Sequence, residues 1–169
     1  LLPADGLQFF GQTAQVMERK WQRAAERLEM LGIPVETISI DVFEHAAKLL
    51  YEGAFVAERW ADLGAFVEAH PGEIFPVTET ILRSGGKASY TAAKLFDDMH
   101  ALALYCHRAA ELLEDAVLAL PTAGGTFTRA EVDDDPVRTN SLMGLYTNHC
   151  NLLDFAAIAV PEDADDHED

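Results

Sequence analysis

Residues 84–89 (SGGKAS) bring serine, glycine and lysine together in one short segment. A lysine can activate a serine nucleophile, which would suit a serine/lysine hydrolase. A glycine-rich loop can also hold phosphate, but no predicted strand precedes this segment and the Walker spacing is missing. Glycine pairs and serines more often end one helix and begin the next. We favour this third interpretation, a turn between two helices.

Two neighbouring pairs, Cys106-His107 and His149-Cys150, consist of residue types that bind metals, and His100 lies seven residues before His107. Four such ligands would suit zinc. The spacing matches no zinc signature, because adjacent residues point about 100° apart on a helix. We therefore predict core and surface roles for these residues, with no metal and no other cofactor.

Most of the acidic residues are interpreted as solvated charge. The run at residues 133–135 lacks the glycine and the terminal glutamate of an EF-hand calcium loop. Four further acids at helical positions are assigned to a solvent-facing side, with no pair suited to acid–base catalysis: Glu52, Glu58, Asp97 and Asp98.

Tyr51 and Arg59 form a candidate anion-binding pair. On a continuous helix their separation of eight residues corresponds to about 800°, or about 80° past two full turns. A loosening of the helix near Gly53 would let both side chains line one side. A phenol hydroxyl and a planar guanidinium together suit a small carboxylate. Spacing alone favours the structural interpretation, with Tyr51 at the rim of an amphipathic helix and Arg59 in a surface ion pair.

Helices dominate the predicted elements that carry these residues. Apolar residues recur at three- and four-residue steps in five segments, which predicts helices over residues 7–31, 41–70, 74–82, 89–115 and 136–155. Asp41 and Ser89 are the expected caps of the second and fourth helices, and breaks are expected near Gly53 and Gly64. A polar loop is expected over residues 122–135.

Three short β-branched or apolar runs, residues 35–40, 116–120 and 156–160, predict strands. The fold class is therefore α/β and predominantly helical. Three short strands do not make an independent sheet, so we expect them to seek strand partners that the chain does not carry.

The composition describes one acidic domain. The chain has 169 residues and a formal net charge of −17, which disfavours binding to nucleic acid or to anionic membrane surfaces. Six of the last eight residues are acidic, so we expect a domain over residues 1–161 and a disordered tail over 162–169. Two cysteines and no apparent signal peptide or membrane span suit a cytoplasmic protein. The opening without methionine suggests a piece of a longer protein.

An ordered series of motifs resembles the later part of the amidase domain of allophanate hydrolases, members of the amidase-signature family. The resemblance spans about residues 3–161. The motifs are LQFFG (7–11), LLYEGAFVAER (49–59), EAHP (68–71), LPTA (120–123), DPVRTNS (135–141), YTN (146–148), NLLD (151–154) and AIAVP (157–161).

The resemblance implies a partial amidase-signature fold and a role in hydrolysing allophanate to ammonia and carbon dioxide during urea degradation. The family's catalytic machinery, a serine nucleophile, a second serine in a cis peptide and a lysine base, belongs to an earlier part of the domain. Residues 84–89 do not match it, so we expect this chain alone to be inactive. The remainder of the amidase domain or a partner chain, and a second copy of the chain, are the expected protein partners.

In this family a tyrosine and an arginine bind the substrate carboxylate. The resemblance implies the same role for Tyr51 and Arg59, which lie in the matching motif LLYEGAFVAER. Two departures concern a substrate-side loop and the core: Gly124 stands where the family usually has proline, and His149-Cys150 replaces an aromatic–apolar pair. An alternative hypothesis is that the chain is a catalytically inactive amidase-like subunit or interaction protein. A third is that it belongs to an amidase of another specificity.

Overall fold

The structure, a computed structural model, describes residues 1–161. The predicted acidic tail, residues 162–169, lies outside the described residues. The helices in chain order are α1 (Ala14–Met30), α2 (Asp41–Glu52), α3 (Phe55–Ala69), α4 (Pro76–Ser84), α5 (Ala92–Leu112), α6 (Arg129–Asp134), α7 (Pro136–Met143) and α8 (Asn148–Leu153). The strands are β1 (Leu2–Pro3), β2 (Phe10–Gly11), β3 (Thr37–Ile38) and β4 (Gly125–Thr126).

The predicted fold class, a predominantly helical α/β fold, is confirmed. The strands form two small parallel sheets, in which β1 pairs with β3 and β2 pairs with β4. Gly124 and Gly125 allow the second pairing, because a Cβ on them would lie 2.1 Å from the Gln8 carbonyl oxygen and 1.9 Å from that of Phe10. Any side chain at either position would force these backbones apart.

The structure contains a strand in one of the three segments predicted as strands. The first is confirmed only at Thr37–Ile38. Residues 116–120 are not a strand, although the Leu1 amine donates to the Val117 carbonyl oxygen and the Ala119 N–H to that of Leu1. Residues 156–160 are not a strand either, and the side chains of Ile158 and Val160 are 90% and 81% exposed. These two predictions were wrong because apolar composition does not by itself supply the ladder of backbone partners that a strand requires.

The helix boundaries also needed correction. The segment predicted as one helix over residues 41–70 breaks at Gly53 but continues through Gly64. The segment over 136–155 is two helices, α7 and α8. Asp41 and Ser89 are not the caps: Ile40 precedes α2 without a side-chain cap, and the Thr91 side chain accepts from the Lys94 N–H at the start of α5.

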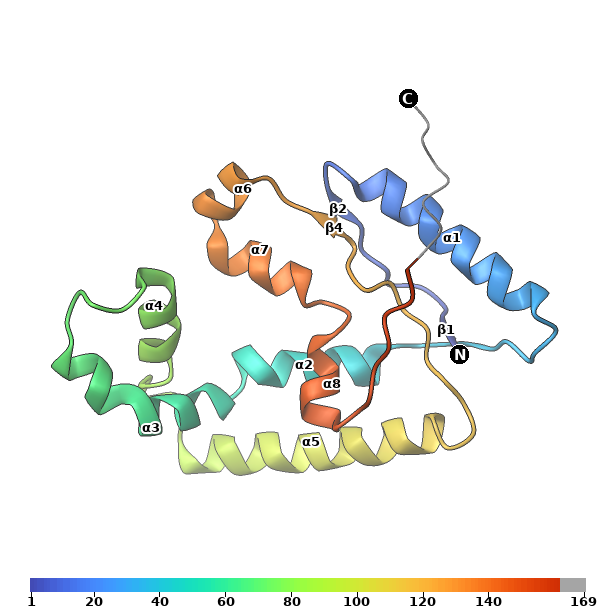
Figure 1. Cartoon of the computed structure of the whole chain (residues 1–169). Coiled ribbons are helices and arrows are strands. Elements are labelled where there is room, and N and C mark those ends of the chain that lie inside the picture. Colours follow the sequence, from blue (N-terminus) through green and yellow to red (C-terminus); the bar gives the residue numbers. More distant parts are fainter. Residues whose placement is uncertain (162–169) are drawn as a thin grey trace.

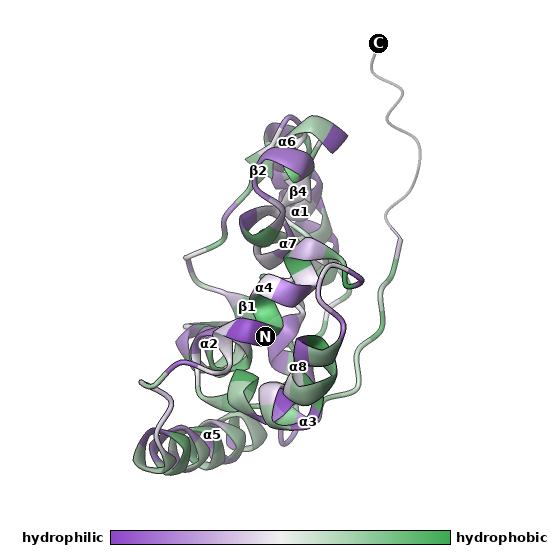
Figure 2. Cartoon of the chain, turned by 90° about the vertical axis from the view of Figure 1, so that its left-hand side faces the viewer, coloured by the Kyte–Doolittle hydropathy of each residue, from purple (hydrophilic) through white to green (hydrophobic). Residues whose placement is uncertain are grey.

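The hydrophobic core lies where α2, α5 and α8 pack together, with α5 running beneath the other two in Figure 1. Its buried members are Ile40, Phe43, Ala46, Ala109 and Leu153. Phe155 still packs against this core, and the segment that follows it runs apart from the helices in Figure 2. Within residues 1–161 no helix combines the length and apolarity needed to cross a membrane.

Candidate functional site

Tyr51 and Arg59 lie on two successive helices and meet across the break between them. Tyr51 is in the last turn of α2, and Arg59 is in the second turn of α3. The Arg59 guanidinium carbon lies 5.5 Å from the centre of the Tyr51 ring. This geometry is a cation–π contact, which holds the guanidinium over the ring face. The structure thus brings the two predicted site residues together.

The break between α2 and α3 allows Arg59 to contact the Tyr51 ring. On a continuous helix, eight residues would separate the two Cα atoms by about 12 Å along the axis and about 80° around it. Gly53 instead has an extended backbone, with φ −86° and ψ 177°. A Cβ at this position would lie 2.7 Å from the Leu49 carbonyl oxygen, which is closer than real Cβ contacts come. The chain can therefore turn here because position 53 is glycine.

Asp98, on α5, contacts the chain at the break between α2 and α3. One of its carboxylate oxygens, Oδ2, accepts the Ala54 N–H at 2.8 Å, and the other forms an ion pair with Lys94. Asp98 is only 4% exposed, so the interpretation of this residue as solvated charge was wrong. The sequence did contain a signal, because Asp98 lies three residues after Leu95 and four before Leu102, on the apolar stripe of the helix.

The polar atoms of the pair are available to a ligand. Among residues 1–161, no carboxylate pairs with the Arg59 guanidinium and no hydrogen bond engages the Tyr51 hydroxyl. Tyr51 is 42% exposed and Arg59 is half-buried, so both face solvent on one side. The guanidinium is always charged and donates only, and the phenol donates one further hydrogen bond. This arrangement can bind a small carboxylate but supplies no nucleophile or base.

Residues 84–86 fit the interpretation as a turn. Ser84 ends α4, and its hydroxyl donates to the Ile81 carbonyl oxygen at 2.6 Å. A Cβ on Gly85 would lie 2.4 Å from the Val56 carbonyl oxygen, and one on Gly86 would lie 2.8 Å from Trp60 Nε1. The two glycines therefore let the end of α4 pack closely against α3, the helix that carries Arg59.

The cysteine–histidine pairs have separate environments. His149 is buried beside Phe43, with 5.4 Å between ring centres, and burial lowers the pKa of its imidazole below the usual range. Burial also raises the pKa of the Cys150 thiol, whose sulfur lies 3.5 Å from His149 Nε2. His107 is exposed on the surface, where its Nε2 lies 3.4 Å from Glu111 Oε1. Within the described part of the chain, no three histidines, cysteines or acids gather as metal ligands.

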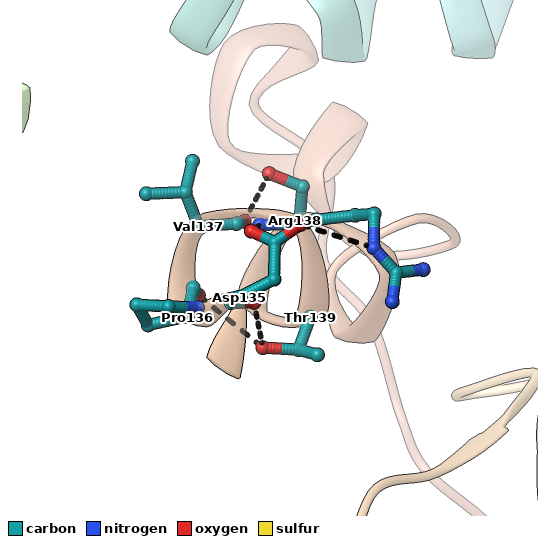
Figure 3. A network of polar contacts seen from close by, with 6 residues as sticks. Asp135, Pro136, Val137, Arg138 and Thr139 are labelled. Atoms are coloured by element: carbon teal, nitrogen blue, oxygen red, sulfur yellow. Dashed lines mark hydrogen bonds and ion pairs between the residues drawn. The ribbon is translucent and has the colours of Figure 1, made fainter. Parts of the chain in front are cut away.

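A cavity of about 360 Å³ lies beside α6 and α7, away from Tyr51 and Arg59. Apolar groups make most of its wall, including Phe127, Val132, Pro136 and Met143. Thr139 also lines it, but the Thr139 hydroxyl is already bonded to the Asp135 carbonyl oxygen at 2.8 Å, as Figure 3 shows. The cavity offers no charged group to a ligand.

Comparison with known proteins gives consistent matches. No protein-family model matches the sequence. Urea amidolyase from Lachancea kluyveri is 33% identical over 156 residues, and that from Saccharomyces cerevisiae is 33% identical over 144 residues. These matches cover 90% and 83% of this chain. The chain spans 8% of the length of either relative.

Solved structures give the same result. A crystal structure of Kluyveromyces lactis allophanate hydrolase superposes with a TM-score of 0.79 at 28% identity, covering 90% of this chain and 25% of that one. A structure of urea amidolyase from the same yeast also gives a TM-score of 0.79 at 28% identity. It covers 90% of this chain and 9% of the matched chain. The fold and the sequence therefore match the same kinds of enzyme, over 83–90% of this chain.

Proposed function

We propose, from the premise that this chain belongs to the allophanate hydrolase family, that its α2–α3 junction binds the carboxylate of allophanate. The enzyme of which such a segment is part would hydrolyse allophanate to ammonia and carbon dioxide, a step in urea degradation. The single observation that supports this role is the contact of Arg59 with Tyr51, which leaves the charge of Arg59 unpaired among residues 1–161.

The chemistry of the pair suits this substrate. Allophanate is a urea that carries a carboxylate, and the carboxylate distinguishes it from neutral amides. The Arg59 guanidinium can donate two parallel hydrogen bonds to the two carboxylate oxygens, a geometry that a lysine cannot reproduce. The ring of Tyr51 supports one face of the guanidinium, and the Tyr51 hydroxyl can donate a further hydrogen bond to the same anion.

The exposure of the pair limits what the isolated chain can do. An ion pair in contact with water contributes only about 0–1 kcal/mol, whereas a charge-assisted hydrogen bond shielded from water contributes about 1.5–3 kcal/mol. Tyr51 is 42% exposed, so tight binding would need a cover over the pair. We expect the remainder of the amidase domain to supply that cover together with the serine and lysine machinery, in the cytoplasm. The chain alone would bind weakly and hydrolyse nothing.

The experiment titrates the 169-residue chain with malonamate, a stable analogue of allophanate in which CH₂ replaces NH, and with neutral malonamide, and follows binding by NMR. We expect malonamate to shift resonances of Tyr51 saturably and malonamide not to. Arg59→Ala should weaken malonamate binding about fivefold, which corresponds to the loss of about 1 kcal/mol from a water-exposed ion pair. Arg59→Lys should not restore the affinity.

Arg83 provides a matched control. Its guanidinium also lies over an aromatic ring, 5.8 Å from Trp60, but its charge is paired with Glu79. Arg83→Ala should leave malonamate binding unchanged. Absence of saturable binding to the unaltered chain, or an equal affinity of the Arg59→Ala chain, would overturn the proposal.

The alternative, an inactive amidase-like subunit or interaction protein, draws support from residues 156–160. Ile158 and Val160 are 90% and 81% exposed in a segment that is not a strand, as expected of a surface that another polypeptide covers. Ammonia release distinguishes the two candidates. A longer protein that contains this chain should release ammonia from allophanate if it is an enzyme, and should release none if it is an inactive subunit.

A further inference from the structure

Asp98 is the least exposed acid of the described chain, at 4%, and no role proposed above uses it. It belongs to α5, yet it hydrogen-bonds the backbone at the start of α3, 44 residues earlier in the chain. A buried carboxylate costs free energy unless it is hydrogen-bonded and paired. Asp98 meets both conditions, through the Ala54 N–H and through Lys94.

The hydrogen bond fixes a particular point of the backbone. Ala54 immediately precedes α3, where the first N–H groups of the helix have no partner within it. Asp98 also lies close to the break itself, since a Cβ on Gly53 would lie 3.1 Å from Asp98 Oδ2. The carboxylate therefore acts as a spacer of defined length between α5 and the start of α3.

We propose that Asp98 is a positioning residue for the Tyr51–Arg59 pair, because it sets the direction in which α3 leaves the break. This inference rests on the proposed function. Arg59 lies five residues beyond Ala54 on the rigid helix α3, so its Cα is about 7.5 Å along the axis from the hinge. A rotation of about 10° at the hinge would move that Cα by about 1.3 Å.

Such a movement is enough to matter for binding. Tyr51 stays on α2, which packs along α5 on the other side of the hinge. A rotation of α3 alone would therefore separate the guanidinium from the ring, now 5.5 Å apart. A hydrogen bond weakens steeply once its donor leaves the preferred distance and angle, so a shift of about 1 Å would disrupt the two parallel hydrogen bonds from Arg59 to a carboxylate. The binding geometry would thus depend on a residue that does not touch the ligand.

The test separates the length of the Asp98 side chain from its charge. Asp98→Asn keeps the length and an oxygen that can accept the Ala54 N–H, whereas Asp98→Glu keeps the charge and adds one methylene. A positioning role predicts malonamate affinity within about twofold of the unaltered chain for Asp98→Asn and about fivefold weaker for Asp98→Glu, as large a loss as that from Arg59→Ala. A role of the charge alone predicts the reverse order, and that result would overturn the inference.

A double-mutant cycle with Arg59→Ala provides the second readout. If Asp98 acts through Arg59, Asp98→Glu should weaken malonamate binding no further once Arg59 is alanine. Equal losses in both backgrounds would instead mean a general effect on folding, and would overturn the inference. Asp97→Glu, an exposed neighbour on α5, is the matched control and should change nothing.

The ring resonances of Tyr51 keep this inference distinguishable from the proposed function. Asp98→Glu should shift them in the absence of any ligand, because Arg59 moves relative to the ring, and Asp97→Glu should not. If malonamate fails to bind but these resonances shift, the proposed function fails and the positioning role stands. If Asp98→Glu leaves them unchanged in a folded chain, the positioning role is wrong.

Discussion

Two aspartates, Asp98 and Asp135, each hold a junction between consecutive helices. They differ in their exposure to solvent and in their distance along the sequence from the junction. Asp98 fixes the α2–α3 break from α5, 44 residues away, and is 4% exposed. Asp135 separates α6 from α7, and its carboxylate accepts the Arg138 N–H at 3.1 Å and contacts Arg138 Nε at 3.2 Å (Figure 3). Its side chain is 47% exposed.

The difference lies in what each junction needs. The α6–α7 junction is assembled from neighbours in sequence: Asp135 caps, Pro136 is the first residue of α7, and Thr139 bonds back to the Asp135 carbonyl oxygen. The α2–α3 junction depends on α5 being in place. A local junction draws its hydrogen bonds from neighbouring residues, while the long-range one requires that α5 already be packed against it. Only the long-range junction adjoins the proposed binding pair.

The largest effect is expected from Asp98→Ala. The substitution leaves the Ala54 N–H buried without its acceptor and removes a hydrogen bond to a charged group, so the free energy of unfolding should fall by about 3 kcal/mol. Urea denaturation of the 169-residue chain measures it. Asp97→Ala, on the exposed side of the same helix, should change the value by no more than about 0.5 kcal/mol. Equal effects at both positions would contradict the assigned burial.

Gly53→Ala should act on the same junction with a somewhat smaller effect. The added Cβ would lie 2.7 Å from the Leu49 carbonyl oxygen, and relief requires movement of backbone, so we expect a loss of about 2 kcal/mol. Gly32→Ala is the control: nothing lies within 4 Å of its Cβ position, and only its φ of +72° is unfavourable. Gly32→Ala should lower the free energy of unfolding by about 1 kcal/mol. A smaller decrease for Gly53→Ala than for Gly32→Ala would contradict the steric argument.

Asp135→Ala should be milder because its junction is exposed and local. Loss of a helix N-cap costs about 1 kcal/mol, measured again by urea denaturation. Asp135→Asn should retain most of the stability, since asparagine caps as well as aspartate. A loss from Asp135→Ala as large as that from Asp98→Ala would remove the distinction between the two junctions.

The smallest effect at neutral pH concerns His149, in the core beside α2. Burial lowers the pKa of its imidazole below the usual value of about 6.5. At pH values between the folded and the unfolded pKa of His149, the unfolded chain binds more protons than the folded chain. The free energy of unfolding therefore keeps its full value above about pH 6.5 and decreases as the pH falls below it.

The measurement compares the free energy of unfolding at about pH 7.5 and about pH 5.5. The loss on acidification should be smaller for His149→Gln than for the unaltered chain, whereas His107→Gln, at an exposed residue, should keep the full loss. An identical pH dependence of the unaltered and His149→Gln chains would contradict the effect of burial.

The sequence permitted prediction of the helical elements better than of the strands. Apolar periodicity located five helical segments, and Gly53 was expected as a break. Residues 116–120 and 156–160 were assigned as strands on their composition, but a strand requires hydrogen-bonding partners that no local pattern specifies. Of the candidate site, Tyr51 and Arg59 were named through resemblance to a family. Asp98 was missed because an acid on a helix is usually solvated.

The sequence by itself determined the local features: a glycine where α2 ends, an aspartate–proline pair where α7 begins, and an apolar stripe along each helix. These depend on backbone freedom and on residues within one or two turns. The tertiary structure decided which acid is buried, which glycines meet a neighbouring backbone, and that Arg59 lies over Tyr51. Each of these depends on packing between residues far apart in sequence, or on the angle at which two helices meet.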